Sequence, residues 1–186
     1  MIIKGATLFD GTGAARKLRQ DVALEGAVIK AVGEDLPANG DARVVEADGL
    51  ALMPGIIDTH THYDAQITWD PGLTPSPELG VSSVVIGNCG FTIAPCREQD
   101  RDLVMRNLTQ VEGMSLDVLR NGIDWNFESF PEYLDALEAR GAAINVAAFI
   151  GHSALRTYVM GADAVERAAT PEEIERMAGI VGEAMR

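Results

Sequence analysis

Three mostly apolar runs constrain the fold of this chain more than any other feature of its sequence. They cover residues 50–58, 81–86 and 144–150, and each has the length and composition of a strand buried on both faces of a sheet. Segments with helical periodicity follow the second and third runs. Buried strands that alternate with amphipathic helices indicate parallel βα units, and therefore an α/β fold. Periodicity alone leaves open whether these units form an open sheet or the start of a barrel.

Three helices are expected after the second and third runs. The first covers 98–112, where apolar residues recur at helical spacing. The second begins at Ser129, which stands three residues before Glu132 in the spacing of a capping box. The third begins at Thr170, and Pro171 takes its first helical position.

Residues 1–53 have a different character. Short strands punctuated by Gly and Asp predict a small antiparallel sheet, with a hairpin at Glu25-Gly26. We therefore predict a β-rich segment over 1–53 and a βα segment over 54–186. The second segment is too short for a whole (β/α)8 barrel, which takes about 250 residues. If it belongs to a barrel, that barrel is incomplete in this chain.

Composition excludes several classes of function. A net charge of −13 argues against nucleic acid as a partner and against docking on an anionic membrane. The start of the chain has no signal-peptide pattern, and no run approaches 18 apolar residues. Two cysteines make no disulfide framework. We expect a cytoplasmic protein with reduced thiols.

Two histidines follow the first apolar run. Asp58, His60 and His62 alternate along an extended chain, so they point the same way. At the rise of a strand the two histidine Cα atoms lie roughly 6.5 to 7 Å apart, and both imidazoles can reach one metal ion. A lone His-X-His is common and is weak evidence by itself. Here it ends a buried strand and holds two of the three histidines of the chain, which favours a metal site.

Cys89 follows the second run and precedes Gly90. A thiolate at a strand end is a strong zinc ligand. Two other roles are open: a small buried apolar residue, or a nucleophile activated by a nearby histidine. Cys96 lies in a less regular stretch and is predicted to be structural.

The third run ends in His152 and Ser153, with Arg156 a turn later. Parallel strands in α/β enzymes carry their functional residues at this end. We expect these three side chains, together with Asp58, to contact substrate or to orient the metal ligands.

Four motifs resemble one known family. They are 54–66 (Pro-Gly-Ile-Ile-Asp-Thr-His-Thr-His-Tyr-Asp-Ala-Gln), 84–91 with Gly-Asn-Cys-Gly, 125–134 and 151–156. The first is similar to the first-strand signature of the amidohydrolase superfamily. The Gly-Asn-Cys-Gly motif narrows the resemblance to the N-acyl-D-amino-acid deacylase (D-aminoacylase) family, and the similarity covers nearly the whole chain.

The resemblance implies a metal-dependent hydrolase with a (β/α)8 TIM barrel and a small β-sandwich built largely from the chain ends. It implies one tightly bound Zn²⁺ held by Cys89 and two later histidines, with His60 and His62 at a second, weaker metal position. A zinc-activated water would attack the linear amide of an N-acyl-D-amino acid. The general-base aspartate is expected beyond Arg186.

The chain departs from this pattern because no histidine or aspartate here matches those later residues. We therefore expect a truncated chain that is inactive alone, completed by a missing C-terminal half or prone to self-association. One alternative is a cyclic-amide hydrolase like a hydantoinase or dihydroorotase. Those enzymes use a bridging lysine, whereas lysine occurs here only at positions 4, 17 and 30. The other alternative is a non-catalytic fragment or interaction module.

Overall fold

The structure is a computed structural model that describes residues 1–186, except for the side chain of Glu112. The chain divides into two compact units, Met1–Gly55 and Ile56–Arg186, and each is described by itself. None of the helices in the described part of the chain has the length and apolar character of a membrane-spanning segment.

The first unit is a five-stranded sheet. Its strands are β1 (Ile2–Leu8), β2 (Lys17–Glu25), β3 (Val28–Gly33), β4 (Val44–Glu46) and β5 (Ala51–Leu52). The order is β3-β2-β1-β4, and β5 also pairs with β1. The predicted hairpin is confirmed, because β2 and β3 are antiparallel around Gly26, which has a φ of 58°. The predicted antiparallel sheet is confirmed only in part. β1–β2 and β2–β3 are antiparallel pairs, whereas β4 and β5 run parallel to β1.

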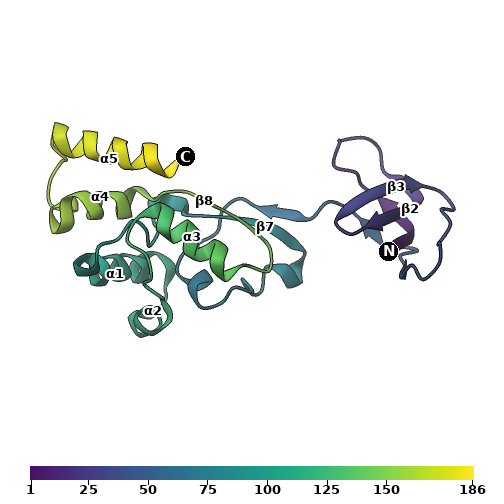
Figure 1. The fold of residues 1–186 in the computed structure, drawn as a ribbon, viewed down its shortest axis with the longest axis horizontal. Coiled ribbons are helices and arrows are strands. Elements are labelled where there is room, and N and C mark those ends of the chain that lie inside the picture. The colour runs from purple at the N-terminus through teal and green to yellow at the C-terminus, as the bar shows by residue number, and fades with distance from the viewer. The chain divides into compact units, whose positions relative to one another are not determined.

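The second unit is built on a parallel sheet. Its strands are β6 (Ile56–Asp58), β7 (Val81–Ile86) and β8 (Asn145–Ala148), in the order β6-β7-β8. Figure 1 labels β7 and β8. Both pairs are parallel, with Asp58 opposite Val84 and Val84 opposite Val146. The predicted parallel βα arrangement is therefore confirmed. All three strands end at the same edge of the sheet.

The run 50–58 does not form the single buried strand that its composition predicted. β5 completes the sheet of the first unit, and β6 begins the sheet of the second. Pro54 stands between them and offers no N–H to a ladder. Ile56 and Ile57 are 49% and 64% exposed, so β6 is not covered on both faces within the described chain.

Helices fill the intervals of the second unit. They are α1 (Arg101–Glu112), α2 (Leu116–Gly122), α3 (Phe130–Arg140), α4 (His152–Met160) and α5 (Pro171–Ala184). Short 3₁₀ turns are η1 (Gln66–Thr68), η2 (Pro77–Leu79), η3 (Asn88–Gly90), η4 (Glu98–Asp100) and η5 (Gly161–Ala164). α1, α3 and α5 confirm the three predicted helices, with η4 as the first turn of the first. α2 and α4 were not predicted.

One apolar cluster joins the sheet to the first three helices. Val84 and Ile86 of β7 belong to it together with Leu108 of α1, Leu119 of α2 and Tyr133 of α3, all of them buried. Burial of side chains of this size stabilises a fold by roughly 1.5 to 3 kcal/mol each. The cluster therefore fixes β7, whose carboxyl end leads directly into η3.

The capping box of α5 is reinforced by an arginine. Thr170 Oγ1 accepts a hydrogen bond from Glu173 N at 3.2 Å, and Glu173 Oε2 accepts one from Thr170 N at 2.8 Å. Arg167 donates two further hydrogen bonds of 2.8 Å to the Glu173 carboxylate. These bonds, first those of Arg167 and then the Thr170 amide, lower the pKa of Glu173 from 4.5 to about 2.

This cap is expected to weaken in acid. The folded-state pKa lies below the ordinary value, so the cap stabilises fully above about pH 4.5 and is lost as the pH falls towards 2. A ¹³C NMR titration of the Glu173 carboxyl group should show a midpoint near 2. Arg167→Met should move that midpoint up towards 4.5. A wild-type midpoint near 4.5 would contradict the ion pair.

Candidate metal centre

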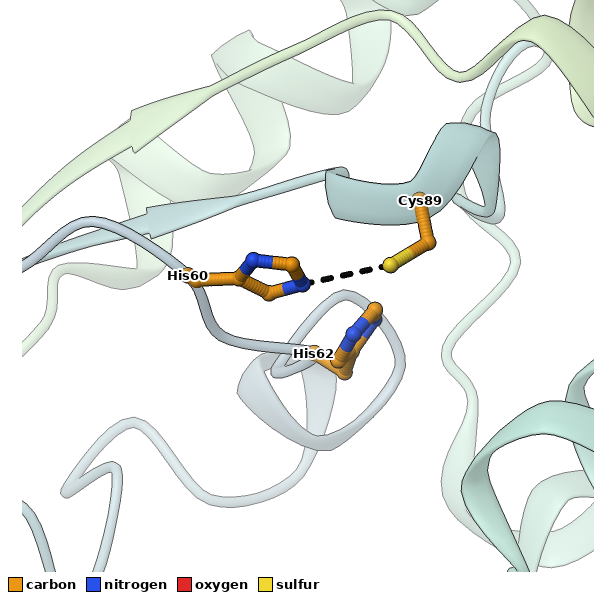
Figure 2. Close-up of side chains that lie close together, drawn as sticks. All are labelled: His60, His62 and Cys89. Carbon is orange, nitrogen blue, oxygen red and sulfur yellow. Dashed lines mark hydrogen bonds between the residues drawn. The ribbon is translucent and has the colours of Figure 1, made fainter.

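Three candidate ligands predicted from the sequence lie together at one edge of the parallel sheet. His60 and His62 follow the end of β6, and Cys89 lies in η3, directly after β7 (Figure 2). Their potential ligand atoms all lie within 4.8 Å of one another. His60 and Cys89 are exposed, and His62 is half-buried.

The cluster has the donor set of a zinc site. His60 Nε2 lies 3.2 Å from Cys89 Sγ, and the two imidazole centroids are 5.3 Å apart. In a tetrahedral site with zinc–nitrogen bonds of about 2.0 to 2.1 Å and a zinc–sulfur bond of about 2.3 Å, neighbouring donors lie roughly 3.3 to 3.6 Å apart. The 3.2 Å between His60 Nε2 and Cys89 Sγ is close to that spacing, and the donor atom of His62 lies within 4.8 Å of both, so these residues are suited to hold the metal that the sequence implies.

Two of the candidate ligands, His60 and Cys89, lie in tight local structures. The backbone N–H of His60 donates to Asp58 Oδ1 at 3.1 Å, which turns the chain as it leaves β6. Cys89 has a φ of 54° and a ψ of 11°, the left-handed region that non-glycine residues avoid. Strained residues of this kind concentrate at functional sites.

Glycines make the turn around Cys89 feasible. Gly87 has a φ of 82°, and a Cβ atom there would lie 2.2 Å from the carbonyl oxygen of Phe149. At Gly151 a Cβ atom would lie 2.8 Å from the carbonyl oxygen of Gly90. The backbones that follow β7 and β8 therefore approach closely on either side of the cysteine.

The residues predicted after β8 lie in α4. His152 is its first residue, and its Cβ lies 3.5 Å from the position that a Cβ on Gly90 would take. Arg156 donates to the carbonyl oxygens of Ala164 and Arg167, at 2.7 Å and 3.0 Å from its Nη2. Ser153 lines a small cavity between α1 and α4. Their roles towards substrate, like that of Asp58, stay predictions.

The two cysteines have different surroundings. Both are free thiols. Cys96 is only 1% exposed and belongs to the apolar cluster, and burial raises the pKa of its thiol to about 12. Cys89 is exposed beside His60. Cys96 therefore has the surroundings of a structural residue, and Cys89 is the thiol that faces the histidines.

Sequence reasoning missed three side chains next to the ligands. Thr61, Asp64 and Asn88 form hydrogen bonds that join the segment following β6 to the end of β7 and to the turn after it. All three lie inside the two strand-end motifs. Alternation along a strand places Thr61 on the opposite side from His60 and His62, so it predicts no role for Thr61 in the site. The spacing of the motifs does not predict which backbone groups the Asn88 amide or the Asp64 carboxylate contacts.

Comparison with known proteins places the chain in a family. A model described as the amidohydrolase family matches residues 43–186. The chain belongs to the amidohydrolase family. D-aminoacylase of Alcaligenes xylosoxydans xylosoxydans is 38% identical over 185 residues, which cover 100% of this chain and 35% of that protein. N-acyl-D-aspartate deacylase of the same organism is 39% identical over 185 residues, covering 100% and 34%. The resemblance predicted from the motifs is confirmed.

Similarity to a cyclic-amide amidohydrolase is partial. A dihydroorotase of Streptomyces coelicolor is 48% identical over 91 residues, which cover 49% of this chain and 18% of that enzyme. The deacylases, in contrast, match this member of the family from end to end. The chain spans about a third of the length of these curated deacylases.

Solved amidohydrolase structures share the fold of this chain. A D-aminoacylase structure described with a binuclear metal centre superposes with a TM-score of 0.80 at 37% identity, covering 99% of this chain and 36% of that one. N-acyl-D-glutamate deacylase from Bordetella bronchiseptica, complexed with zinc and a phosphonate inhibitor, gives a TM-score of 0.77 at 32% identity, covering 98% and 35%. The mixed α/β fold thus matches one region of the deacylases.

Proposed function

We propose that this chain forms part of a metal-dependent hydrolase of linear amide C–N bonds that deacylates N-acyl-D-amino acids. The convergence of Cys89 on His60 and His62 at the ends of two adjacent parallel strands carries the proposal. Relatives that match the whole chain are named for deacylation of D-amino acid derivatives, which supports this substrate class. The dihydroorotase match covers only about half of the chain and gives less support to a cyclic amide.

In this proposal Cys89 holds one tightly bound Zn²⁺, and His60 and His62 contribute to a second, weaker metal position. Zinc, when bound, supplies a Lewis acid that makes water a usable nucleophile at neutral pH. The residues of this chain present a thiol and two imidazoles at fixed positions, and Asp58 keeps His60 on that side of the sheet through the bond to its backbone N–H. His152, Ser153 and Arg156 are proposed to contact substrate or to support the ligands.

The proposal extends to the fold. β6, β7 and β8 would be the first strands of a (β/α)8 barrel over residues 54–186, and residues 1–53 would form part of a β-sandwich. Division of the chain into compact units after Gly55 and the TM-score of 0.80 to a D-aminoacylase support this assignment.

A hybrid enzyme tests the deacylase proposal. Residues 1–186 replace the corresponding third of the Alcaligenes D-aminoacylase, and acetate release is measured from N-acetyl-D- and N-acetyl-L-amino acids. We expect zinc-dependent hydrolysis of the D-isomer, at least about tenfold faster than of the L-isomer. We expect no release from the 186 residues by themselves, because they span 35% of that enzyme.

The matched control is the same hybrid with Cys89→Ser, which removes the proposed ligand and leaves the rest of the graft intact. A wild-type hybrid that folds and binds zinc but hydrolyses neither isomer would contradict the deacylase function. Hydrolysis of dihydroorotate alone would favour the cyclic-amide alternative, and activity that survives Cys89→Ser unchanged would remove the cysteine from the mechanism.

A further inference from the structure

We propose that Asn88 is a positioning residue for the metal centre, because its side-chain amide ties the histidine segment to the turn that carries Cys89. This inference rests on the proposed function, since it concerns the same cluster. Asn88 touches none of the reacting groups in the proposal. It would act through the ligands on either side of it.

The contacts of Asn88 join the two ligand-bearing segments. Its Nδ2 donates to the carbonyl oxygen of Thr61 at 3.2 Å and to that of Val85 at 2.8 Å. Thr61 stands between His60 and His62, and Asn88 directly precedes Cys89. The side chain of the residue next to Cys89 therefore contacts the residue that stands between the two histidines.

The carbonyl oxygen of Val85 is the centre of this connection. Besides Asn88 Nδ2, it accepts hydrogen bonds from Thr61 N at 3.1 Å and from Thr61 Oγ1 at 2.8 Å. Thr61 is only 8% exposed, and hydrogen bonds shielded from water hold their geometry more strongly than exposed ones. We call this set of bonds among Thr61, Val85 and Asn88 the amide brace.

A second set of hydrogen bonds, made by Asp64, joins the histidine segment to the turn that carries Cys89 without involving Asn88. Gly87 N donates to Asp64 Oδ2 at 3.0 Å, and the hydroxyl of Tyr133 donates to the backbone carbonyl of Asp64 at 2.9 Å. Tyr133 is fully buried in the apolar cluster, so Asp64 is anchored to α3. Loss of the Asn88 amide should therefore loosen the ligands without unfolding the unit.

The left-handed backbone of Cys89 makes the turn sensitive to such loosening. A non-glycine residue in this region relaxes if the surrounding structure ceases to hold it. Metal sites need their ligands held within about 0.5 Å of the productive geometry. Without the amide brace, Cys89 Sγ should move away from the histidines.

The test compares Asn88→Ala with a matched control, Asn145→Ala. Asn145 also has a side-chain amide that bonds between adjacent strands, to Ser82 O at 3.0 Å and to Ser83 Oγ at 3.3 Å. It lies at the start of β8, whereas the ligands follow the ends of β6 and β7. The control therefore removes an interstrand amide from the same sheet and leaves the amide brace intact.

Hydrogen exchange on the metal-free chain gives the first readout. Asn88→Ala should speed exchange of the Thr61 amide at least about tenfold, while the Gly87 amide, which Asp64 holds, stays protected as in the wild type. Asn145→Ala should change neither. Unchanged Thr61 exchange in Asn88→Ala would overturn the proposal, and so would equal acceleration along the whole of β7, because that pattern denotes a general structural role.

Cobalt titration gives the second readout, through the charge-transfer absorption between a thiolate and Co²⁺. Asn88→Ala should weaken Co²⁺ binding by about 10- to 100-fold, the usual effect of losing a group that orients a metal ligand, and should lower the band at saturation. Asn145→Ala should match the wild type. Equal affinity and equal absorption in Asn88→Ala would overturn the proposal. A wild-type chain without any cobalt binding would contradict the proposed function instead, while the exchange result still decides the role of Asn88.

Discussion

Zinc binding by this chain should weaken by about 100-fold or more when Cys89 is replaced by serine. A thiolate is among the strongest protein ligands for zinc, whereas a serine hydroxyl stays protonated near neutral pH and is a poor ligand. The sulfur lies 3.2 Å from His60 Nε2, so the substitution removes one of three converging donors without changing the size of the side chain greatly. Competition with a chromophoric chelator measures the dissociation constant.

The other thiol supplies the control for this prediction. Cys96→Ala should bind zinc as tightly as the wild type, because Cys96 is buried in the apolar cluster and its pKa of about 12 keeps it protonated. His60→Ala should weaken binding by a smaller factor than Cys89→Ser, because His60 is assigned to the weaker metal position. The double variant should lose less than the product of the two effects, since His60 Nε2 and Cys89 Sγ lie 3.2 Å apart and substitutions of residues in contact are not independent. Equal affinity in Cys89→Ser and the wild type would remove this cysteine from the site.

The clustering of the three candidate ligands was predictable from sequence because parallel strands place their carboxyl ends at one edge of a sheet. That rule predicts that His60 and His62 lie close to Cys89, although Cys89 comes 27 positions after His62 in the sequence. Capping boxes predicted the starts of α3 and α5 for a similarly local reason, since Ser129 and Thr170 carry the signal within three residues.

Other features depend on contacts that no local pattern records. α4 begins at His152 behind Gly151, where no side chain caps the helix, so the capping signal is missing. The run 50–58 predicts a single strand, because apolar composition does not reveal that Ala51 pairs with β1 and Ile56 with β7. The amide brace depends on how the two strand-end segments approach each other. Residue spacing gives no measure of that approach.

Replacing Gly87 by alanine is expected to lower the free energy of unfolding of residues 56–186 by about 2 to 5 kcal/mol. The left-handed backbone contributes roughly 1 to 2 kcal/mol, and forcing an atom into an occupied site costs typically 1 to 3 kcal/mol more. The added Cβ would lie 2.2 Å from the carbonyl oxygen of Phe149. Phe149 cannot move aside cheaply, because its backbone N–H donates to Ile86 O at 3.0 Å and continues the β7–β8 ladder.

Gly113→Ala separates the cost of the left-handed backbone from the cost of the steric overlap at Gly87. Gly113 also has a positive φ, 65°, but nothing lies within 4 Å of its Cβ position, so only the conformational cost of about 1 to 2 kcal/mol should remain. Urea denaturation followed by tryptophan fluorescence suits this comparison, because both tryptophans, Trp69 and Trp125, lie in the second unit. If Gly87→Ala destabilises the unit no more than Gly113→Ala does, the result would contradict the close approach of the Phe149 carbonyl oxygen to Gly87. A larger loss at Gly87 would show that the turn presenting Cys89 admits only glycine at this position, because of the backbone that follows β8.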